Sequence, residues 1–169
     1  MKVFLIGYMG CGKSTMGRKL SERLDVAFID LDKYIEQKYF KTIPQIFEEE
    51  GEAEFRLKEQ AALKEVAEFD DVIVATGGGA PCFFDNMEVM NQAGLCVFLD
   101  VDAEELAHRL IHSKTERPLI KGKSPEELVD FILEMMKKRR PFYEKARCVL
   151  KGKEIVPEQV VAEIEKRSE

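Results

Sequence analysis

The amino-acid sequence predicts an α/β protein built around a parallel sheet. Short apolar runs alternate with longer amphipathic segments along the chain. Most of the short runs are continuously apolar, which is typical of parallel strands that helices cover on both faces. A glycine-rich segment joins the first apolar run directly to the first amphipathic segment. Alternation of this kind favours right-handed strand–helix–strand crossovers within one sheet.

The strands are predicted from their apolar composition and short length. They are expected at 2–6 (KVFLI), 26–29 (VAFI), 72–75 (VIVA), 95–99 (LCVFL) and 147–150 (RCVL). Each run is too short to form a helix of ordinary length.

The helices are predicted from amphipathic segments between these strands. They are expected at 13–24, 32–40, 43–50, 52–68, 85–93, 103–112, 125–140 and 157–167. Asp102 and Ser124 are each followed three positions later by a glutamate, the pattern of a capping box at a helix start. Pro125 then stands at the first helical position, where proline is favoured. This helix, expected over 125–140, begins with two glutamates and ends with the basic run 137–140, a charge distribution that complements the helix dipole.

Length and charge restrict the class of protein. With 169 residues the chain is long enough for one hydrophobic core, so we expect a single domain over 1–169. No apolar run approaches the ~18 residues that span a bilayer, and no cleavage site follows a long apolar stretch. We therefore expect neither a membrane segment nor a signal peptide. The formal net charge of −6 argues against general nucleic-acid binding, which needs a basic surface.

Cysteine and histidine spacing gives no metal site. The four cysteines contain no Cys-x-x-Cys pair, so we expect reduced thiols of a cytoplasmic protein rather than zinc ligands or disulfides. These cysteines are Cys11, Cys82, Cys96 and Cys148. His108 and His112 are four positions apart on a predicted helix, but no third ligand is evident, so exposed helical histidines are expected.

The most specific pattern is the phosphate-binding loop GYMGCGKST at 7–15, which satisfies G-x-x-x-x-G-K-[ST]. It lies after a predicted strand and before a predicted helix, so backbone amides and the helix N-terminus would face phosphate oxygens. Lys13 would reach the β- and γ-phosphates, and the Ser14 hydroxyl would bind Mg²⁺. A dinucleotide-binding fingerprint is excluded, since Thr15 stands at the third glycine position. The later Gly122-Lys123-Ser124 follows a loop and is interpreted as a helix cap.

Two further segments follow predicted strands. Asp30 and Asp32 come at the end of the second strand, where open α/β sheets bind ligands. They could serve metal and substrate separately; alternatively, Asp32 is a helix N-cap. The segment Thr76-Gly77-Gly78-Gly79 follows the third strand, and its glycines would let a ligand or side chain approach closely. The alternative for the glycines is a tight turn.

Isolated arginines complete the candidates. A bound ATP brings about four negative charges, which this acidic chain must offset locally. The basic loop 113–123 is therefore predicted as a lid that excludes water and stabilises the charge in transfer. Each arginine taken alone is more simply interpreted as a surface residue. These arginines are Arg56, Arg109, Arg117 and Arg139.

Together these residues resemble the shikimate kinases, small enzymes of the nucleoside-monophosphate-kinase-like fold. The resemblance runs nearly end to end. It rests on the phosphate loop, FIDLD at 28–32, IFEEEGEAEFR at 46–56, TGGG at 76–79, RPL at 117–119 and RRPFY at 139–143. It implies a three-layer αβα P-loop fold with a five-stranded parallel sheet in the order 2-3-1-4-5. It also implies a nucleotide core, an acceptor-binding insertion near 31–60 and a lid near 111–123.

The resemblance implies a role for each matching residue. ATP would contact Gly10, Cys11, Gly12, Lys13, Ser14, Thr15, Arg109 and Arg117. Shikimate would contact Asp32, Arg56, Gly78, Gly79 and Arg139. Mg²⁺ would be held by Ser14 and, through water, by Asp30. The catalytic residues would be Asp32 as proton acceptor, with Lys13 and Arg117 stabilising the transferred phosphoryl group.

The implied reaction transfers the γ-phosphoryl group of Mg·ATP to the 3-hydroxyl of shikimate, in chorismate and aromatic amino acid biosynthesis. ATP and shikimate are then the partners of a cytoplasmic monomer that needs no nucleic acid or membrane. One alternative is another small P-loop kinase, acting on gluconate or a nucleoside monophosphate. The Asp30/Asp32 pair together with Phe55-Arg56 and the triple glycine argues against it. The other alternative, a non-catalytic nucleotide-binding module, predicts loss of catalytic residues that this sequence retains.

Overall fold

The computed structural model describes residues 1–113 and 120–167, and five of its strands form one parallel sheet. The strand order is β2-β3-β1-β4-β5, as expected. The bounds are β1 Lys2–Ile6, β2 Ala27–Asp30, β3 Val72–Ala75, β4 Leu95–Val101 and β5 Cys148–Gly152. The central strand β1 pairs with β3 and β4, so that Leu5 is in register with Ala75 on one side and Val97 on the other.

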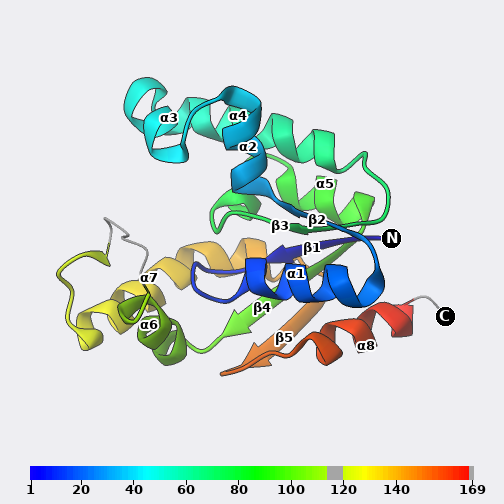
Figure 1. Cartoon of the computed structure of the whole chain (residues 1–169). Coiled ribbons are helices and arrows are strands. Elements are labelled where there is room, and N and C mark those ends of the chain that lie inside the picture. The colour runs from blue at the N-terminus through cyan, green and yellow to red at the C-terminus, as the bar shows by residue number, and fades with distance from the viewer. Residues whose placement is uncertain (114–119, 168–169) are drawn as a thin grey trace.

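Helices cover both faces of this sheet and form the expected three layers (Figure 1). Their bounds are α1 Lys13–Leu24, α2 Leu31–Tyr39, α3 Ile43–Glu50, α4 Glu52–Val66, α5 Asn86–Ala93, α6 Ala103–Ile111, α7 Pro125–Tyr143 and α8 Pro157–Arg167. Helices α1 and α8 lie against each other on one face. Helices α2, α3 and α4 pack together at the top of Figure 1, beside the edge strand β2.

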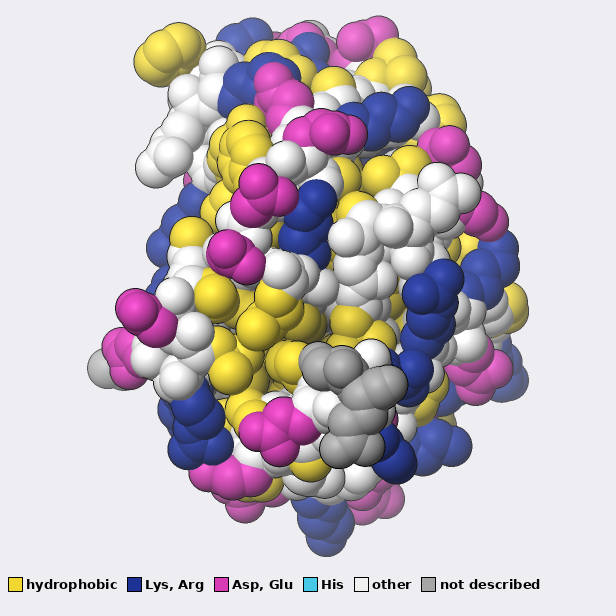
Figure 2. Space-filling view, turned by 90° about the vertical axis from the view of Figure 1, so that its right-hand side faces the viewer, with side chains coloured by type: hydrophobic (Ala, Val, Ile, Leu, Met, Phe, Trp, Pro, Cys, Tyr) yellow, Lys and Arg dark blue, Asp and Glu magenta, His cyan; other side chains and the backbone are white. Residues whose placement is uncertain are grey.

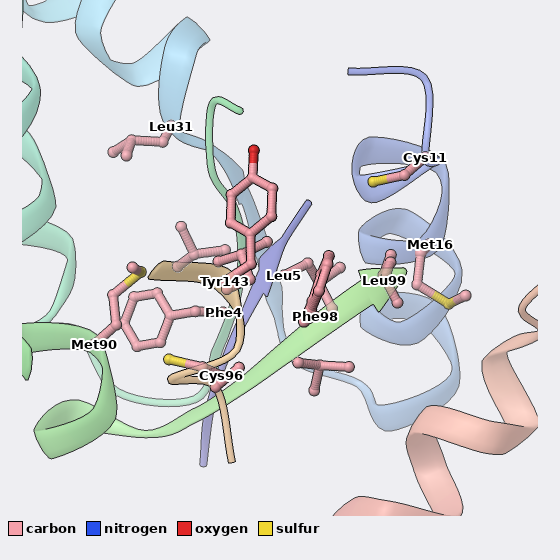
Figure 3. Packing of buried hydrophobic residues seen from close by; sticks show 14 of the residues in the cluster. Phe4, Leu5, Cys11, Met16, Leu31, Met90, Cys96, Phe98, Leu99 and Tyr143 are labelled. Carbon is pink, nitrogen blue, oxygen red and sulfur yellow. The ribbon is translucent and has the colours of Figure 1, made fainter. Parts of the chain in front are cut away.

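The hydrophobic core fills the space on both sides of the central strands. Figure 3 shows Met16 of α1 on one side of β1 and β4, and Met90 of α5 on the other. Phe4, Leu5 and Phe98 between them are fully buried, which explains why these strands are continuously apolar. The core therefore fixes the sheet, and with it the carboxyl ends of the strands.

Most predicted boundaries agree with the structure to within two residues, and the exceptions have physical reasons. Helix α7 continues through Pro141 to Tyr143, beyond the predicted end at residue 140. Its last turn is held by Tyr143, whose ring packs on Phe98 with centroids 5.0 Å apart and whose hydroxyl donates to Gly78 O at 2.6 Å. These tertiary contacts outweigh the local preference of proline to end a helix.

The predicted capping signals have different outcomes. Ser124 forms the full capping box with Glu127, as predicted. Asp102 precedes α6 but makes no side-chain cap, so that prediction was wrong. Asp30 is the N-cap of α2, and its carboxylate accepts from the Lys33 amide at 3.3 Å. Asp32 therefore lies inside the first turn of α2, and the alternative of an N-cap at Asp32 is excluded.

The two ends of the sheet differ in character. All strands point towards the left of Figure 1, where the loops after β1 and β3 lie. Figure 2 shows the opposite end, near the N-terminus, where lysine and arginine side chains are interspersed with acidic ones around a hydrophobic centre.

Across residues 1–113 and 120–167, no helix is long and apolar enough to cross a membrane.

Gly17 lets α1 pack closely against β2. A Cβ at this position would overlap the Phe28 ring. We therefore expect Gly17→Ala to lower the free energy of unfolding by about 1–3 kcal/mol, the usual cost of overpacking. At an unstrained helix position the same change would stabilise by roughly 1 kcal/mol. Urea unfolding of the variant measures the difference.

A double variant tests whether the overlap with the Phe28 ring causes the loss of stability in Gly17→Ala. The Phe28→Leu exchange shortens the opposing side chain, so the Gly17→Ala/Phe28→Leu double variant should be more stable than the sum of the single effects predicts. A Gly17→Ala variant that is more stable than the wild type would contradict close packing at this position.

Candidate active site

One cavity of about 910 Å³ lies at the carboxyl ends of β1, β2 and β3. Its lining comprises 9–16, Lys19, Asp30, Asp32, Lys33, Glu36, Ile43, Pro44, 76–78, Arg109, Glu154, Ile155 and Pro157. It therefore joins five parts of the chain that are distant in sequence: the phosphate loop, the α2–α3 region, the glycine segment after β3, Arg109 of α6 and the segment before α8. The carboxyl ends of strands are where open α/β sheets bind ligands.

The phosphate loop has the geometry of an anion site. Gly12 is the N-cap of α1 with φ 95°, a left-handed conformation that favours glycine, and no side chain caps the helix. The Nζ of Lys13 lies 2.7 Å from Gly7 O and 3.3 Å from Tyr8 O. The lysine thus crosses the loop, and the helix N-terminus is left for phosphate.

Ser14 and Asp30 bring two oxygen ligands together beside the loop. The Ser14 hydroxyl donates to Asp30 Oδ2 at 3.0 Å, although the two residues belong to α1 and β2. Mg²⁺ prefers hydroxyl, carboxylate, water and phosphate oxygens over nitrogen or sulfur. The pair therefore fits the metal of a Mg·nucleotide, and both residues line the cavity.

Asp32 lies one helical position past Leu31 and faces the same cavity. Burial raises the pKa of its carboxyl, and the negative charges of Asp30 and Glu36 raise it further. The positive charges of Lys13 and Arg56 act in the opposite direction. A carboxylate with a raised pKa is a better proton acceptor than an ordinary exposed one.

The three glycines after β3 each lie against one predicted site residue. A Cβ on Gly77 would lie 2.9 Å from Asp32 Oδ1. A Cβ on Gly78 would lie 3.0 Å from a terminal nitrogen of Arg139, and one on Gly79 would lie 2.7 Å from Nη2 of Arg56. The segment does form a turn, because the Ala80 amide donates to Gly77 O at 3.2 Å. Ordinary Cβ contacts are longer than the three distances above, so glycine at these positions also allows the close approach of the three side chains. Arg56, Gly79 and Arg139 do not themselves line the 910 Å³ cavity, but they meet the same glycine segment.

The two adjacent arginines of α7 have different partners. Arg139 reaches Gly78, and its Nη1 donates to the Tyr143 hydroxyl at 3.4 Å. Arg140 makes a two-point ion pair with the buried Asp100 of β4, at 2.8 and 3.2 Å. Arg140 is therefore a structural residue, whereas Arg139 lies at the glycine segment.

Sequence reasoning missed Glu59, which holds Arg56. Glu59 is only 1% exposed, and its Oε1 accepts from Arg56 Nη1 at 2.9 Å. Burial raises the pKa of Glu59 to about 7, against the opposing charge of Arg56. The available signal was a glutamate three positions after Arg56, on the helix face that also buries Phe55 and Ala62.

Arg109 connects the phosphate loop with the segment before α8. Its Nη1 donates to Gly10 O at 3.2 Å, its Nη2 to Lys153 O at 2.8 Å, and its Nε pairs with Glu105 at 3.0 Å. It thus lies at the end of the cavity that Ile155 also lines. Arg117 and the rest of 114–119, the middle part of the predicted lid, lie outside the described residues.

The remaining predictions concern metal and thiol chemistry. His108 and His112 are exposed on α6, as predicted, with ring centroids 4.4 Å apart. In residues 1–113 and 120–167 there is no group of three or more His, Cys, Asp or Glu side chains that could hold a metal. The four cysteines are free thiols, and Cys11 is buried with its Sγ 3.8 Å from Lys13 Nζ.

Comparisons with known proteins agree on one family. The family model described as shikimate kinase matches residues 9–169. A shikimate kinase of Parabacteroides distasonis is 53% identical over 163 residues, covering 96% of this chain and 94% of the relative. The crystal structure of shikimate kinase from Bacteroides thetaiotaomicron has a TM-score of 0.90 and 46% identity, covering 98% of this chain and 97% of that one. A shikimate kinase from Acinetobacter baumannii in complex with shikimate has a TM-score of 0.83 and 36% identity, covering 98% of this chain and 90% of that one.

Glu59 should make stability depend on pH. Its pKa is about 7 in the folded protein and 4.5 in the unfolded chain, so the folded state binds the extra proton between these values. The contribution of Glu59 to the free energy of unfolding should therefore fall as pH rises from about 4.5 to about 7, by up to ~1.4 kcal/mol per pH unit.

The measurement compares wild type with Glu59→Gln, which removes the titrating group and keeps its shape. Urea unfolding at several pH values gives the difference in unfolding free energy between the two proteins. The unfolding free energy of the wild type should fall relative to that of Glu59→Gln as pH rises from about 4.5 to about 7. A difference that stays constant with pH would contradict the raised pKa.

Proposed function

This chain belongs to the shikimate kinase family, and from that membership we propose that it transfers the γ-phosphoryl group of ATP to the 3-hydroxyl of shikimate. The products are shikimate 3-phosphate and ADP, in the route to chorismate and aromatic amino acids. The observation that carries the proposal is the glycine segment 77–79, which brings a carboxylate and two arginines together beside the phosphate loop. An acceptor with a hydroxyl and a carboxylate matches that set of groups.

Arg56 and Arg139 would bind the carboxylate of shikimate, with the backbone of Gly78 and Gly79 beside it. Both guanidinium groups approach this backbone to within 3.0 Å of where a Cβ would stand. Guanidinium groups bind carboxylates through two parallel hydrogen bonds, a geometry that lysine cannot reproduce. This arrangement would orient the ring so that one hydroxyl faces Asp32.

Asp32 would accept the proton of the attacking hydroxyl. It must be ionised to do so, and the charges of Lys13 and Arg56 favour the ionised form. General-base assistance of this kind contributes ~10²- to 10⁴-fold to the rate. Lys13 would move from the carbonyls of the loop to the β- and γ-phosphates and stabilise the charge that develops in transfer.

The nucleotide would lie along the phosphate loop from Gly10 to Thr15. Bound Mg²⁺ would neutralise phosphate charge there, held by Ser14 and, through water, by Asp30, whose side chains are 3.0 Å apart. At the far end of the cavity, Arg109 would contact the nucleoside part, since it lies between the loop and the segment near residue 153. Arg117, which lies outside the described residues, stays a prediction for the transferred phosphoryl group.

We propose the same division of the chain as the sequence indicated: a nucleotide core, an acceptor-binding insertion near 31–60 and a lid near 111–123. The insertion is supported by α2 and α4, which supply Asp32 and Arg56. The protein would work in the cytoplasm as a monomer, with ATP and shikimate as its partners and without nucleic acid or membrane. The acidic composition and the free thiols support this setting.

The reaction is tested by measuring ADP release from Mg·ATP with shikimate, gluconate, AMP, CMP or no acceptor. Release only with shikimate, and a product carrying one added phosphate, is expected. The Asp32→Asn variant should lose ~10²- to 10⁴-fold in kcat while it binds ATP normally, because only the proton acceptor is removed. Turnover with gluconate or a nucleoside monophosphate in place of shikimate would overturn the proposed acceptor, and wild-type-like kcat in Asp32→Asn would remove Asp32 from its role.

Arg139→Lys should weaken shikimate binding about tenfold or more and leave ATP binding nearly unchanged, since loss of a charge-assisted hydrogen bond costs roughly 1.5–3 kcal/mol. Arg140→Lys is the matched control, because Arg140 is paired with Asp100 instead. The control should lower stability without altering the affinity for shikimate. Calorimetry with each ligand measures both affinities. Equal losses for ATP and shikimate in Arg139→Lys would exclude a carboxylate-binding role.

A further inference from the structure

The guanidinium group of Arg56 is contacted on several sides. Among the residues that contact it, Phe83 has no other evident role. Nη1 of Arg56 donates to Glu59 at 2.9 Å, and its Nη2 lies 2.7 Å from where a Cβ of Gly79 would stand. The ring of Phe83 lies under the group, with 4.1 Å between its centroid and Arg56 Cζ. The Arg56 side chain is 14% exposed as a result.

The contact with Phe83 is closer than the other cation–ring contacts of the described residues. The other cation–ring distances in residues 1–113 and 120–167 are 5.0 Å or longer, including that from Arg56 to Phe55 at 5.1 Å. A ring at 4.1 Å lies against the face of a guanidinium group, where cation–π attraction is effective. Stacking on a face leaves the N–H groups at the edge free to point outward in the plane.

One edge of this guanidinium still has hydrogen-bonding capacity. Nε of Arg56 is buried and has no hydrogen-bond partner; the exposed Glu52 carboxylate is 3.7 Å away. Nη1 is already engaged by Glu59, so the edge formed by Nε and Nη2 is the one suited to a second carboxylate. A buried donor without a partner is costly, and an incoming carboxylate would satisfy it.

The backbone that carries Phe83 is fixed from both directions. The amide of Asn86 donates to Phe83 O at 3.2 Å, and the Asn86 side chain donates to Ala80 O at 2.9 Å. Asn86 is fully buried, so this short segment after the glycines has little freedom. Phe83 itself belongs neither to the hydrophobic core nor to the side chains packed against it. Its ring is therefore placed for Arg56 rather than for core packing.

We propose that Phe83 is a positioning residue for acceptor recognition, whose ring fixes the plane of Arg56 so that the Nε edge meets the carboxylate of the acceptor. The proposal rests on the proposed function and adds a residue and a binding edge to it. Phe83 does not line the cavity that contains the phosphate loop, and it contacts Arg56, so it acts on acceptor affinity through Arg56. Its removal should consequently raise KM for shikimate and leave kcat and KM for ATP nearly unchanged.

The test exchanges Phe83 for leucine, which keeps an apolar side chain but removes the aromatic face. KM for shikimate should rise about tenfold in Phe83→Leu, in line with a partly desolvated cation–π contact. Phe83→Tyr retains the face and should restore KM to within about twofold of the wild type. Phe84→Leu is the matched control: Phe84 is the next residue and is 56% exposed, so its KM should not change.

A second measurement links the effect to the carboxylate. Competition binding compares shikimate with its carboxamide, which cannot accept the same charge-assisted pair of hydrogen bonds. The preference for the acid over the amide should shrink in Phe83→Leu and stay intact in Phe84→Leu. The proposal is overturned if Phe83→Leu behaves as wild type, if it weakens ATP and shikimate equally, if tyrosine does not rescue, or if the preference for the acid is unchanged. Failure of wild-type turnover with shikimate would instead overturn the proposed function, so the two failures are separate.

Discussion

The close approach of three side chains to the segment Gly77–Gly79 is the constraint on which the site depends. Asp32 comes from α2, Arg56 from α4 and Arg139 from α7, and each lies where one of these glycines has no side chain. The segment follows β3, next to the central strand, so its position is set by the core of the sheet. Three helices thus each place one charged side chain against a single short stretch of backbone that follows a strand of the sheet.

The arginines Arg56 and Arg140 differ in how far their hydrogen-bond donors are used inside the protein. Both terminal nitrogens of Arg140 donate to the buried Asp100, and this ion pair connects α7 with β4. Arg56 donates to Glu59 through one nitrogen, and its Nε makes no hydrogen bond, only an ion pair with the exposed Glu52 at 3.7 Å. Each buried charge is therefore compensated enough to be tolerated, while the donors that point at the glycine segment keep capacity for a ligand. Unused donor capacity in a buried arginine is a better sign of a binding role than the charge itself.

The sequence predicted the parts of the structure whose physical cause is local. Apolar runs gave the strands, and the phosphate loop was evident because all its functional atoms come from consecutive residues. The strand order, by contrast, came only from the resemblance to a family, since periodicity does not specify neighbours in a sheet. The extension of α7 to Tyr143 could not be predicted, because it depends on contacts with Phe98 and Gly78 that are remote in sequence.

The candidate site shows the same division. Asp30 and Asp32 were predictable from their place at the end of a strand, although which of them caps α2 was not. Glu59 had a local signal in its spacing from Arg56, and that signal was missed. The stacking of Phe83 on Arg56 had no signal of this kind, since it joins two segments that only the folded chain brings together.

Helix α7 carries two consecutive arginines that contact different parts of the protein, and this limits how the length of the helix can change. Successive residues of an α-helix are rotated by about 100°, which sends Arg139 to the glycine segment and Arg140 to Asp100. Insertion or deletion of a single residue between Met136, which is buried in the core, and Arg139 would turn both arginines away from their partners at once. Length variation among homologues should therefore be absent from this stretch of α7 and confined to surface loops, so an ungapped alignment block here is a consequence of geometry.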